Sequence, residues 1–238
     1  MITRDTTNDG QTSANQLTSS TLTVAITLAN GATLHLFVGV ANTAGAVEPT
    51  GVTYNAVPLS GGRSLSFGTY NSFSEWFGWK IGPSDGLPHN LVVTMAGVTD
   101  CIVGWWSAWN GVNVDPNLSN NNRQNGSGTT TTDATVANAG EILISGVTSE
   151  IGTTPAKDAA LIEIPSTGST RGHIDPGGGL SVAFGEAYRT DGSGGTLTNH
   201  WTVGSGAWCA IARVLQPGTA LVPPRAMHHY RQRRTSRR

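Results

Sequence analysis

The sequence is poor in charge, in lysine and in long apolar runs. Only 12% of its 238 residues are charged, and Lys80 and Lys157 are its only lysines. This composition does not suit the charged outer faces of amphipathic helices, so we predict little helix. No stretch approaches the length of a membrane-spanning helix, and residues 1–17 contain no apolar run. We therefore expect neither a membrane span nor a secretory signal.

Cysteine is also scarce. Cys101 and Cys209 are the only two, and each stands in an apolar run next to a tryptophan or close to one. Two cysteines in a chain of this length do not make a disulfide framework. We interpret both as small hydrophobic core residues, and they indicate no redox compartment.

Glycine and small polar residues are abundant, and they separate short apolar runs at intervals of about ten residues. The chain has 31 glycines, and many of them stand in turn clusters such as residues 175–179 and 191–195. Short strands joined by tight turns predict an all-β fold, specifically an antiparallel β-sandwich that is jelly-roll-like. We expect one sandwich domain over residues 21–216, preceded by an extended N-terminal arm at residues 1–20. A Pro-containing spacer and an Arg-rich tail follow at residues 217–238.

The tryptophan-rich stretch Cys101–Pro116 is the expected centre of the sandwich. In a strand, Trp105 and Trp109 point to one face and Trp106 points to the other, so both faces are apolar. Such a strand needs an opposing sheet on one side and a loop or a partner subunit on the other. Asn110-Gly111 is a turn dipeptide, so the strand is expected to end there.

Two further local patterns give definite expectations. Alternating residues at 21–28 and 33–40, separated by Asn30-Gly31, predict a β-hairpin. Residues 117–132 are a polar run of low complexity, which we interpret as a surface loop or a seam between subunits.

The last fourteen residues carry a charge opposite to that of the rest. They hold six of the 14 basic residues and none of the 15 acidic ones, so the tail carries +6 and the body about −7. Arginine interleaved with aromatic residues is typical of segments that bind anionic surfaces. The predicted partner-binding residues of the tail are Arg225, His228, His229, Tyr230, Arg231, Arg233, Arg234, Arg237 and Arg238.

Reactive groups do not converge in the sequence. Glu75, Glu141, Glu163 and Glu186 stand singly, without the paired acids of glycoside hydrolases, and we expect each to be exposed to solvent. His173 and Asp175 share a strand face but precede a Pro-Gly-Gly-Gly run, so a loop tip is favoured over half of a metal or acid–base site. The glycine-rich run after Asp191 lacks the acidic closing ligand of a calcium loop. We therefore predict no enzyme, no cofactor and no metal site.

Tryptophans on strands have two interpretations. We predict that Trp76, Trp79, Trp106 and Trp109 contribute to an aromatic interface as well as to the core. The alternative is a platform that stacks against sugar rings, as in a carbohydrate- or receptor-binding domain of a tail fibre or surface protein.

Several segments together resemble a known kind of module. They are Leu34–Val40, Val52–Leu59, Glu75-Trp76-Phe77 leading to Gly82-Pro83, Asn90–Thr94 and Trp109-Asn110-Gly111-Val112. The pattern covers roughly residues 20 to 115 and resembles β-sandwich modules of tailed-bacteriophage structural proteins and of some bacterial surface proteins. The resemblance brings no catalytic residues.

The resemblance and the cationic tail together predict a non-enzymatic virion protein. The expected role is that of a capsid decoration (cement) protein that stabilises the assembled head lattice. Its expected partners are the major capsid protein or other virion subunits and further copies of itself, with a trimer as one arrangement. Nucleic acid is a less favoured partner, and a membrane is not expected. The expected location is the capsid surface, after assembly in the host cytoplasm; a tail location stays open.

Overall fold

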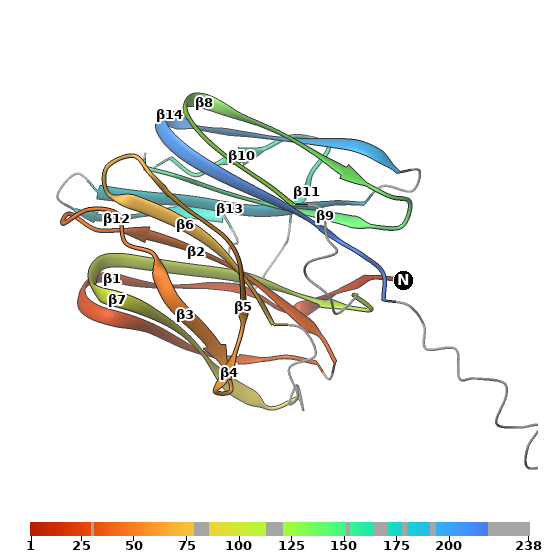
Figure 1. Ribbon diagram of the computed structural model, residues 1–238, viewed down its shortest axis with the longest axis horizontal. Coiled ribbons are helices and arrows are strands. Elements are labelled where there is room, and N and C mark those ends of the chain that lie inside the picture. The colour runs from red at the N-terminus through yellow and green to blue at the C-terminus, as the bar shows by residue number, and fades with distance from the viewer. Residues whose placement is uncertain are drawn as a thin grey trace, which may run out of the picture.

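The computed structural model describes residues 1–29, 31–78, 86–112, 121–150, 153–163, 171–177, 180–190 and 194–218. Within these ranges the chain forms strands and no helix, so no described helix is long and apolar enough to cross a membrane. Figure 1 shows the strands arranged as two layers that face each other.

Each layer is a seven-stranded sheet formed by one contiguous half of the chain. Sheet 1 contains β1 (Thr3–Thr27), β2 (Thr33–Ala41), β3 (Pro49–Tyr54), β4 (Val57–Pro58), β5 (Ser60–Phe67), β6 (Asn71–Gly78) and β7 (Pro88–Asn110). Sheet 2 contains β8 (Asn121–Ala137), β9 (Ile142–Ser149), β10 (Ala156–Lys157), β11 (Ile162–Glu163), β12 (Arg171–Gly177), β13 (Leu180–Thr190) and β14 (Gly195–Leu215).

The strand connections of the two sheets correspond. In sheet 1 the long β7 pairs with β1 on one edge and with β2 and β3 on the other, and β2 continues to β6 and β5. In sheet 2 the long β14 pairs with β8 on one edge and with β9 and β10 on the other, and β9 continues to β13 and β12. The halves are therefore structural repeats, although no repeat is evident in the sequence.

Every pairing is antiparallel, so the predicted all-β antiparallel sandwich is confirmed. The strand order does not confirm the more specific expectation of a jelly-roll-like topology. A jelly roll is a double-sheet Greek-key arrangement. Here, by contrast, all strands of the first half lie in sheet 1 and all strands of the second half lie in sheet 2.

The long strand β7 must bend sharply, because the chain that connects its neighbours is short. Thr27 at the end of β1 pairs with Pro88, and Thr33 at the start of β2 pairs with Trp109. The five residues between the two threonines give six Cα–Cα steps, which span at most about 20 Å. A straight strand from Pro88 to Trp109 would measure about 70 Å. The ends of β7 are thus brought close together, and sheet 1 curls until β3 contacts β5 and β6.

The long strand β14 obeys the same constraint. Ala137 of β8 pairs with Gly195, and Ile142 of β9 pairs with Leu215, so the four residues 138–141 must bridge the two ends of β14. Both long strands show register shifts in the middle, between Ser19 and Thr21 opposite β7 and between Thr202 and Gly206 of β14. Such irregularities concentrate twist and allow a strand to bend.

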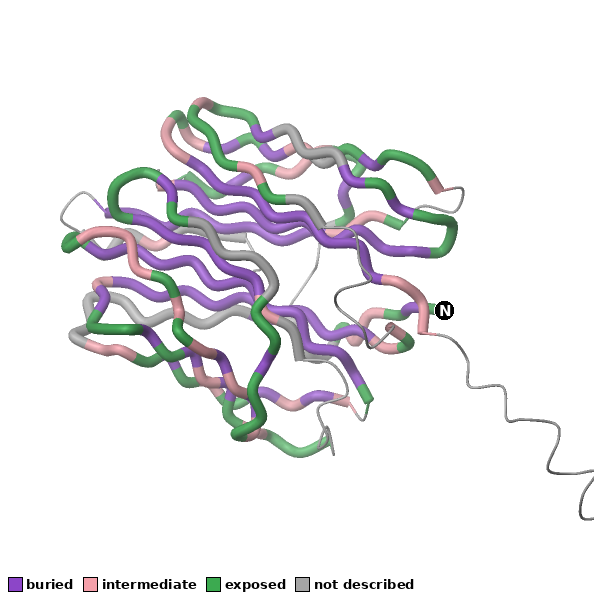
Figure 2. Tube along the Cα trace, viewed as in Figure 1, coloured by how far each residue is buried: buried purple, intermediate pink, exposed green. Residues whose placement is uncertain are grey.

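The curled sheets produce separate cores, visible as continuous buried segments along the inner strands in Figure 2. The core between the sheets takes side chains from both halves, including Phe37, Phe73, Trp105, Trp109, Ile144, Val182, Phe184 and Ile211. A second core lies inside the curl of sheet 1 and includes Leu22, Leu36, Val38, Tyr54, Leu91 and Trp106. Smaller clusters line the corresponding side of sheet 2.

The tryptophan strand is central, as predicted, and it ends at Asn110. One of its two apolar faces is covered as expected, and the other is not. Trp105 and Trp109 meet the opposing sheet, whereas Trp106 lies in the core that sheet 1 forms by curling on itself. The second cover therefore comes from the same sheet, not from a loop or a partner subunit.

Three local expectations differ from the structure. The predicted hairpin of residues 21–28 and 33–40 is wrong, because β1 and β2 pair with opposite edges of β7. Residues 3–20, expected as a separate arm, are extended but belong to β1 and pair with the tryptophan strand. The predicted polar loop at 117–132 is largely the edge strand β8, since residues 121–132 pair with β14. Polar edge strands gain their stability from backbone hydrogen bonds to a buried neighbour, which apolar periodicity does not report.

Gly146 gives a direct test of how closely the two sheets approach. A Cβ atom at this position would lie 2.5 Å from two carbons of the Phe37 ring on the opposing sheet. We predict that Gly146→Ala destabilises the protein by about 1–3 kcal/mol, because the inter-sheet core has no room for a methyl group.

Chemical denaturation measures this effect, with Gly51→Ala as the matched control. Gly51 also lies in a strand, and its Cβ would meet no atom within 4 Å. Adding Phe37→Leu to Gly146→Ala should restore part of the lost free energy of unfolding. Equal stability of the two single alanine variants would contradict the inter-sheet packing described above.

Candidate functional site

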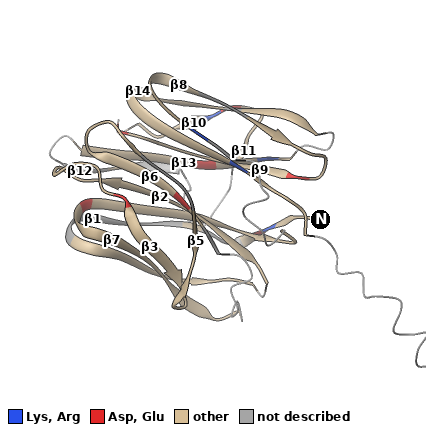
Figure 3. Ribbon diagram, viewed as in Figure 1, with Lys and Arg blue, Asp and Glu red and all other residues tan. Residues whose placement is uncertain are grey.

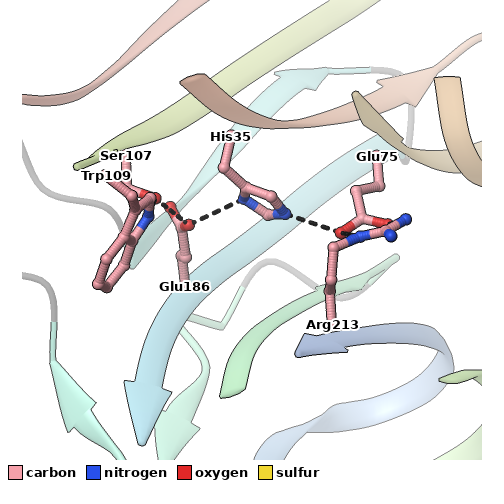
Figure 4. Close-up of polar contacts among 6 residues, drawn as sticks. All are labelled: His35, Glu75, Ser107, Trp109, Glu186 and Arg213. Carbon is pink, nitrogen blue, oxygen red and sulfur yellow. Dashed lines mark hydrogen bonds and ion pairs between the residues drawn. The ribbon is translucent and has the colours of Figure 1, made fainter. Parts of the chain in front are cut away.

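A cluster of charged side chains lies inside the inter-sheet core (Figure 4). It consists of His35 on β2, Glu75 on β6, Glu186 on β13 and Arg213 on β14, which are at most 2% exposed. All four share the strand faces that carry the inter-sheet aromatic residues, because His35 is two residues from Phe37 and Glu186 is two residues from Phe184. The cluster therefore joins sheet 1 to sheet 2.

The ion pair between Glu75 and Arg213 crosses from one sheet to the other. The Nε of Arg213 donates to Oε1 of Glu75 at 2.9 Å, and its NH2 group donates to Oε2 at 2.8 Å. This bidentate geometry satisfies both carboxylate oxygens at once and is the strong form of a charged hydrogen bond.

His35 lies between the two glutamates. Its Nε2 is 2.7 Å from Oε1 of Glu75, and its Nδ1 is 3.3 Å from Oε1 of Glu186. A ring that faces a carboxylate on each side is best satisfied when both nitrogens carry a proton. The cluster then holds two positive and two negative charges and is neutral overall.

Glu186 receives a further hydrogen bond from sheet 1. The hydroxyl of Ser107 donates to Oε1 of Glu186 at 2.8 Å, and the indole N–H of Trp109 donates to the same hydroxyl oxygen at 2.8 Å. Tyr188 packs edge-on against Trp109, and the guanidinium of Arg4 lies over the Tyr188 ring. Hydrogen bonds and then ring contacts thus connect the centre of the core to the N-terminal strand.

The strand registers place the cluster at corresponding positions of the two halves. Glu75 lies opposite Phe37, which lies opposite Trp105; Glu186 lies opposite Gly146, which lies opposite Ile211. Trp105 of β7 and Ile211 of β14 are therefore corresponding residues. Two residues further along these strands, Ser107 corresponds to Arg213. Each glutamate therefore bonds the corresponding residue of the other half, one a serine and the other an arginine.

The environment shifts two pKa values in opposite directions. Burial alone would lower the pKa of His35, but hydrogen bonds and negative charge from Glu186 and Glu75 outweigh it, so the pKa is raised above its ordinary 6.5. Burial alone would raise the pKa of Glu75, but the charge of Arg213 and the contacts with His35 hold it at about 2. Both shifts favour the charged forms.

These groups are sealed from solvent. The side chains of His35, Glu75 and Glu186 are 0% exposed, so a substrate cannot touch them while the sheets stay packed. Among the described residues there is also no group of three or more His, Cys, Asp or Glu side chains placed to hold a metal ion. The contacts of this cluster therefore fix the position of one sheet relative to the other.

The prediction that the single glutamates face solvent is wrong for three of the four. Glu75 and Glu186 are fully buried, and Glu141 is 6% exposed and accepts hydrogen bonds from the backbone and side chain of Asn138. The side chain of Glu163 lies outside the described part. A signal was present in the sequence: Phe73-Ser-Glu75 and Phe184-Gly-Glu186 each place an acid on an aromatic strand face, in matching positions of the two halves.

The predicted aromatic interface is not assembled as a surface. Trp109 and Trp106 are 0% and 6% exposed and belong to different cores. Trp76 is half-buried, and its indole N–H donates to Ser74. Trp79 lies outside the described residues. The described tryptophan rings therefore pack in or against the cores and do not form a sugar-stacking platform.

The remaining predicted residues have mixed outcomes. All nine partner-binding residues of the tail, from Arg225 to Arg238, lie outside the described residues. His173 and Asp175 belong to the strand β12 and not to a loop tip, although their side chains are not described. Cys101 and Cys209 are buried, as predicted, and both are free thiols. Burial, with a smaller effect from the charge of Asp100, raises the pKa of Cys101 to about 12.

Comparison with known proteins gives no relative, because no family model, no curated protein and no solved structure matches the chain.

The cluster predicts that stability depends on pH at both ends of the scale. The contribution of His35 is complete below pH 6.5 and is lost as pH rises through its raised pKa in the folded state. The contribution of Glu75 is complete above pH 4.5 and is lost as pH falls toward its folded value of about 2. We expect the cluster to contribute most to the free energy of unfolding between these limits.

Urea denaturation of the wild type and His35→Gln at pH values from well below 4.5 to well above 6.5 measures the effect. In the wild type the free energy of unfolding should fall as pH rises through the pKa of His35, and this fall should be absent in the variant. The fall at acid pH that belongs to Glu75 should remain in both proteins. An identical alkaline limb in both proteins would show that His35 does not carry the charge assigned to it.

The ion pair predicts non-additive mutations. Arg213→Met leaves Glu75 without its main counter-charge and should cost about 3–5 kcal/mol of stability. Adding Glu75→Gln removes the stranded charge and should recover a substantial part of that loss. A double-mutant cycle in denaturant provides the measurement, and strict additivity of the two losses would refute the coupling.

Proposed function

We propose that this protein is a non-enzymatic structural component of a virion, specifically a decoration protein that binds the surface of an assembled phage head. The observation that carries the proposal is the separation of charge: a body of about −7 is joined to a terminal segment of +6. A protein built this way can contact two surfaces of different character at the same time.

The geometry of the chain ends supports this proposal. The N–H of Gly218 donates to the carbonyl of Gly111 at 2.7 Å, and Val112 forms a bridge with Pro217. Gly111 also lies against the backbone of Met1. Gly218, the last described residue before the cationic segment, therefore lies next to the start of β1 at one corner of the sandwich (Figure 1).

The character of the sandwich fits a supporting role. Charged positions are sparse across both sheets (Figure 3), and four of the charged side chains are committed to the link between the sheets. By this proposal the body binds the assembled lattice in preference to free subunits and stabilises it by mass action. The tail adds contacts to a neighbouring acidic subunit at high effective concentration.

Deletion of the chain after Pro224 tests the proposal. We expect the truncated protein to bind purified heads of the phage that encodes it at least tenfold more weakly than the full chain, with a smaller dependence on salt. Co-sedimentation with the heads at several salt concentrations measures this affinity.

A matched pair of full-length variants separates charge from length. Changing the six tail arginines to glutamine should weaken binding as truncation does, whereas changing them to lysine should preserve most of it. Unchanged occupancy of the heads after truncation would overturn the proposed role of the tail. Absence of binding by the full chain would overturn the decoration function itself.

A further inference from the structure

A pocket of about 460 Å³ lies at the end of sheet 1 that is far from sheet 2. The turn between β3 and β4 forms one wall, and the first residues of β7 form the other. Its lining includes Thr53, Asn55, Ala56, Pro88, His89 and Asn90. This volume falls within the range of pockets that hold small ligands in proteins.

The turn that forms the wall holds an unfavourable backbone conformation. Asn55 and Ala56 have φ angles of 49° and 62°, and Tyr54 pairs with Val57 across them, which makes a two-residue hairpin turn with positive φ at both positions. Asparagine tolerates this conformation, but alanine does so at a cost of about 1 kcal/mol. Glycine would be the ordinary residue at the second position.

Contacts on both sides hold this wall in place. The N–H of Asn55 donates to the carbonyl of Asn90 at 3.0 Å, which ties the turn to β7. The buried Tyr54 donates its hydroxyl to the carbonyl of Ile26, and its ring packs edge-on against His89 at 5.8 Å. The pocket is thus preformed, which reduces the entropy lost on binding.

The chemistry of the lining selects a class of ligand. The described lining residues contain no Asp, Glu, Lys or Arg, so none of them offers a counter-charge to an ionic ligand. Instead, Asn55 and Asn90 carry carboxamides and Thr53 a hydroxyl, whereas the imidazole of His89 packs edge-on against the Tyr54 ring on the opposite strand face. Each carboxamide can donate and accept at once, which matches adjacent hydroxyl groups. Pro88 adds an apolar surface suited to the C–H face of a sugar ring.

We propose that this pocket binds a neutral saccharide, with hydrogen bonds from the side chains of Asn55, Asn90 and Thr53. The inference goes beyond the structural role proposed above and uses none of the tail residues. It gives the protein a second contact, directed to glycan, at the end of sheet 1.

Titration of the ¹⁵N-labelled full chain with neutral sugars tests the proposal. The probes are glucose, galactose, mannose, N-acetylglucosamine and N-acetylgalactosamine with their common disaccharides, and glucuronate is the charged control. We expect at least one neutral sugar to cause saturable chemical-shift changes at residues 53–56 and 88–92, with a weaker response to glucuronate.

Two substitutions in the same turn distinguish the contribution of the Asn55 side chain to binding from an effect on the stability of the turn. Asn55→Gly suits the backbone conformation and should leave thermal stability unchanged or higher, yet it should weaken sugar binding about tenfold. Ala56→Gly relieves the strain and retains every polar side chain, so it should be more stable and bind as the wild type does. Both variants should bind phage heads normally, so failure here is distinguishable from failure of the decoration role.

Two results would overturn the proposal. One is the absence of shift changes in the 53–56 and 88–92 segments for every sugar at concentrations far above millimolar. The other is equal sugar affinity of Asn55→Gly and the wild type, which would place any binding elsewhere on the molecule.

Discussion

The inter-sheet ion cluster constrains the relative position of the two halves of this protein. Glu75 has its counter-charge, Arg213, on the other sheet, and Glu186 is contacted by His35 and Ser107 from sheet 1. Charges buried in an apolar layer are tolerable only while their partners remain within hydrogen-bond distance. A slide of one sheet over the other would separate these charges from their partners. The cluster therefore supplies specificity of packing rather than reactivity.

The corresponding connections of the two halves explain why such a cluster can form. In each half a long central strand bends so that its ends approach, and a polar edge strand follows it around the bend. Each curled half encloses apolar residues of its own and presents an aromatic face with one glutamate to the other half. The asymmetry of the repeats is then informative: Arg213 stands where Ser107 stands in the first half, so a guanidinium bonds Glu75, whereas Glu186 is bonded by a hydroxyl and faces the His35 ring.

This distribution of chemistry bears on function. The ionisable groups at the centre are used to join the sheets, and the described tryptophans fill cores. Within the described part of the chain, two separate places on the sandwich are proposed for contact with other molecules. One is the corner where Gly218, the last described residue, meets Gly111, and the other is the polar pocket beside the strained turn of Asn55 and Ala56. The proposed decoration role uses the first, and the proposed saccharide site uses the second.

The sequence by itself determined the all-β class, the central position and the end of the tryptophan strand, and the burial of both cysteines. These features follow from local alternation and turn residues, which act over a few neighbours. Only the tertiary structure decided that residues 3–20 and 121–132 are edge strands, that residues 21–28 and 33–40 do not form a hairpin, and that Glu75 and Glu186 are buried. A polar strand is stabilised by the backbone of a distant partner, and a carboxylate is stabilised in a core by charges more than a hundred residues away. Neither partner is encoded in the neighbourhood of the residue that depends on it.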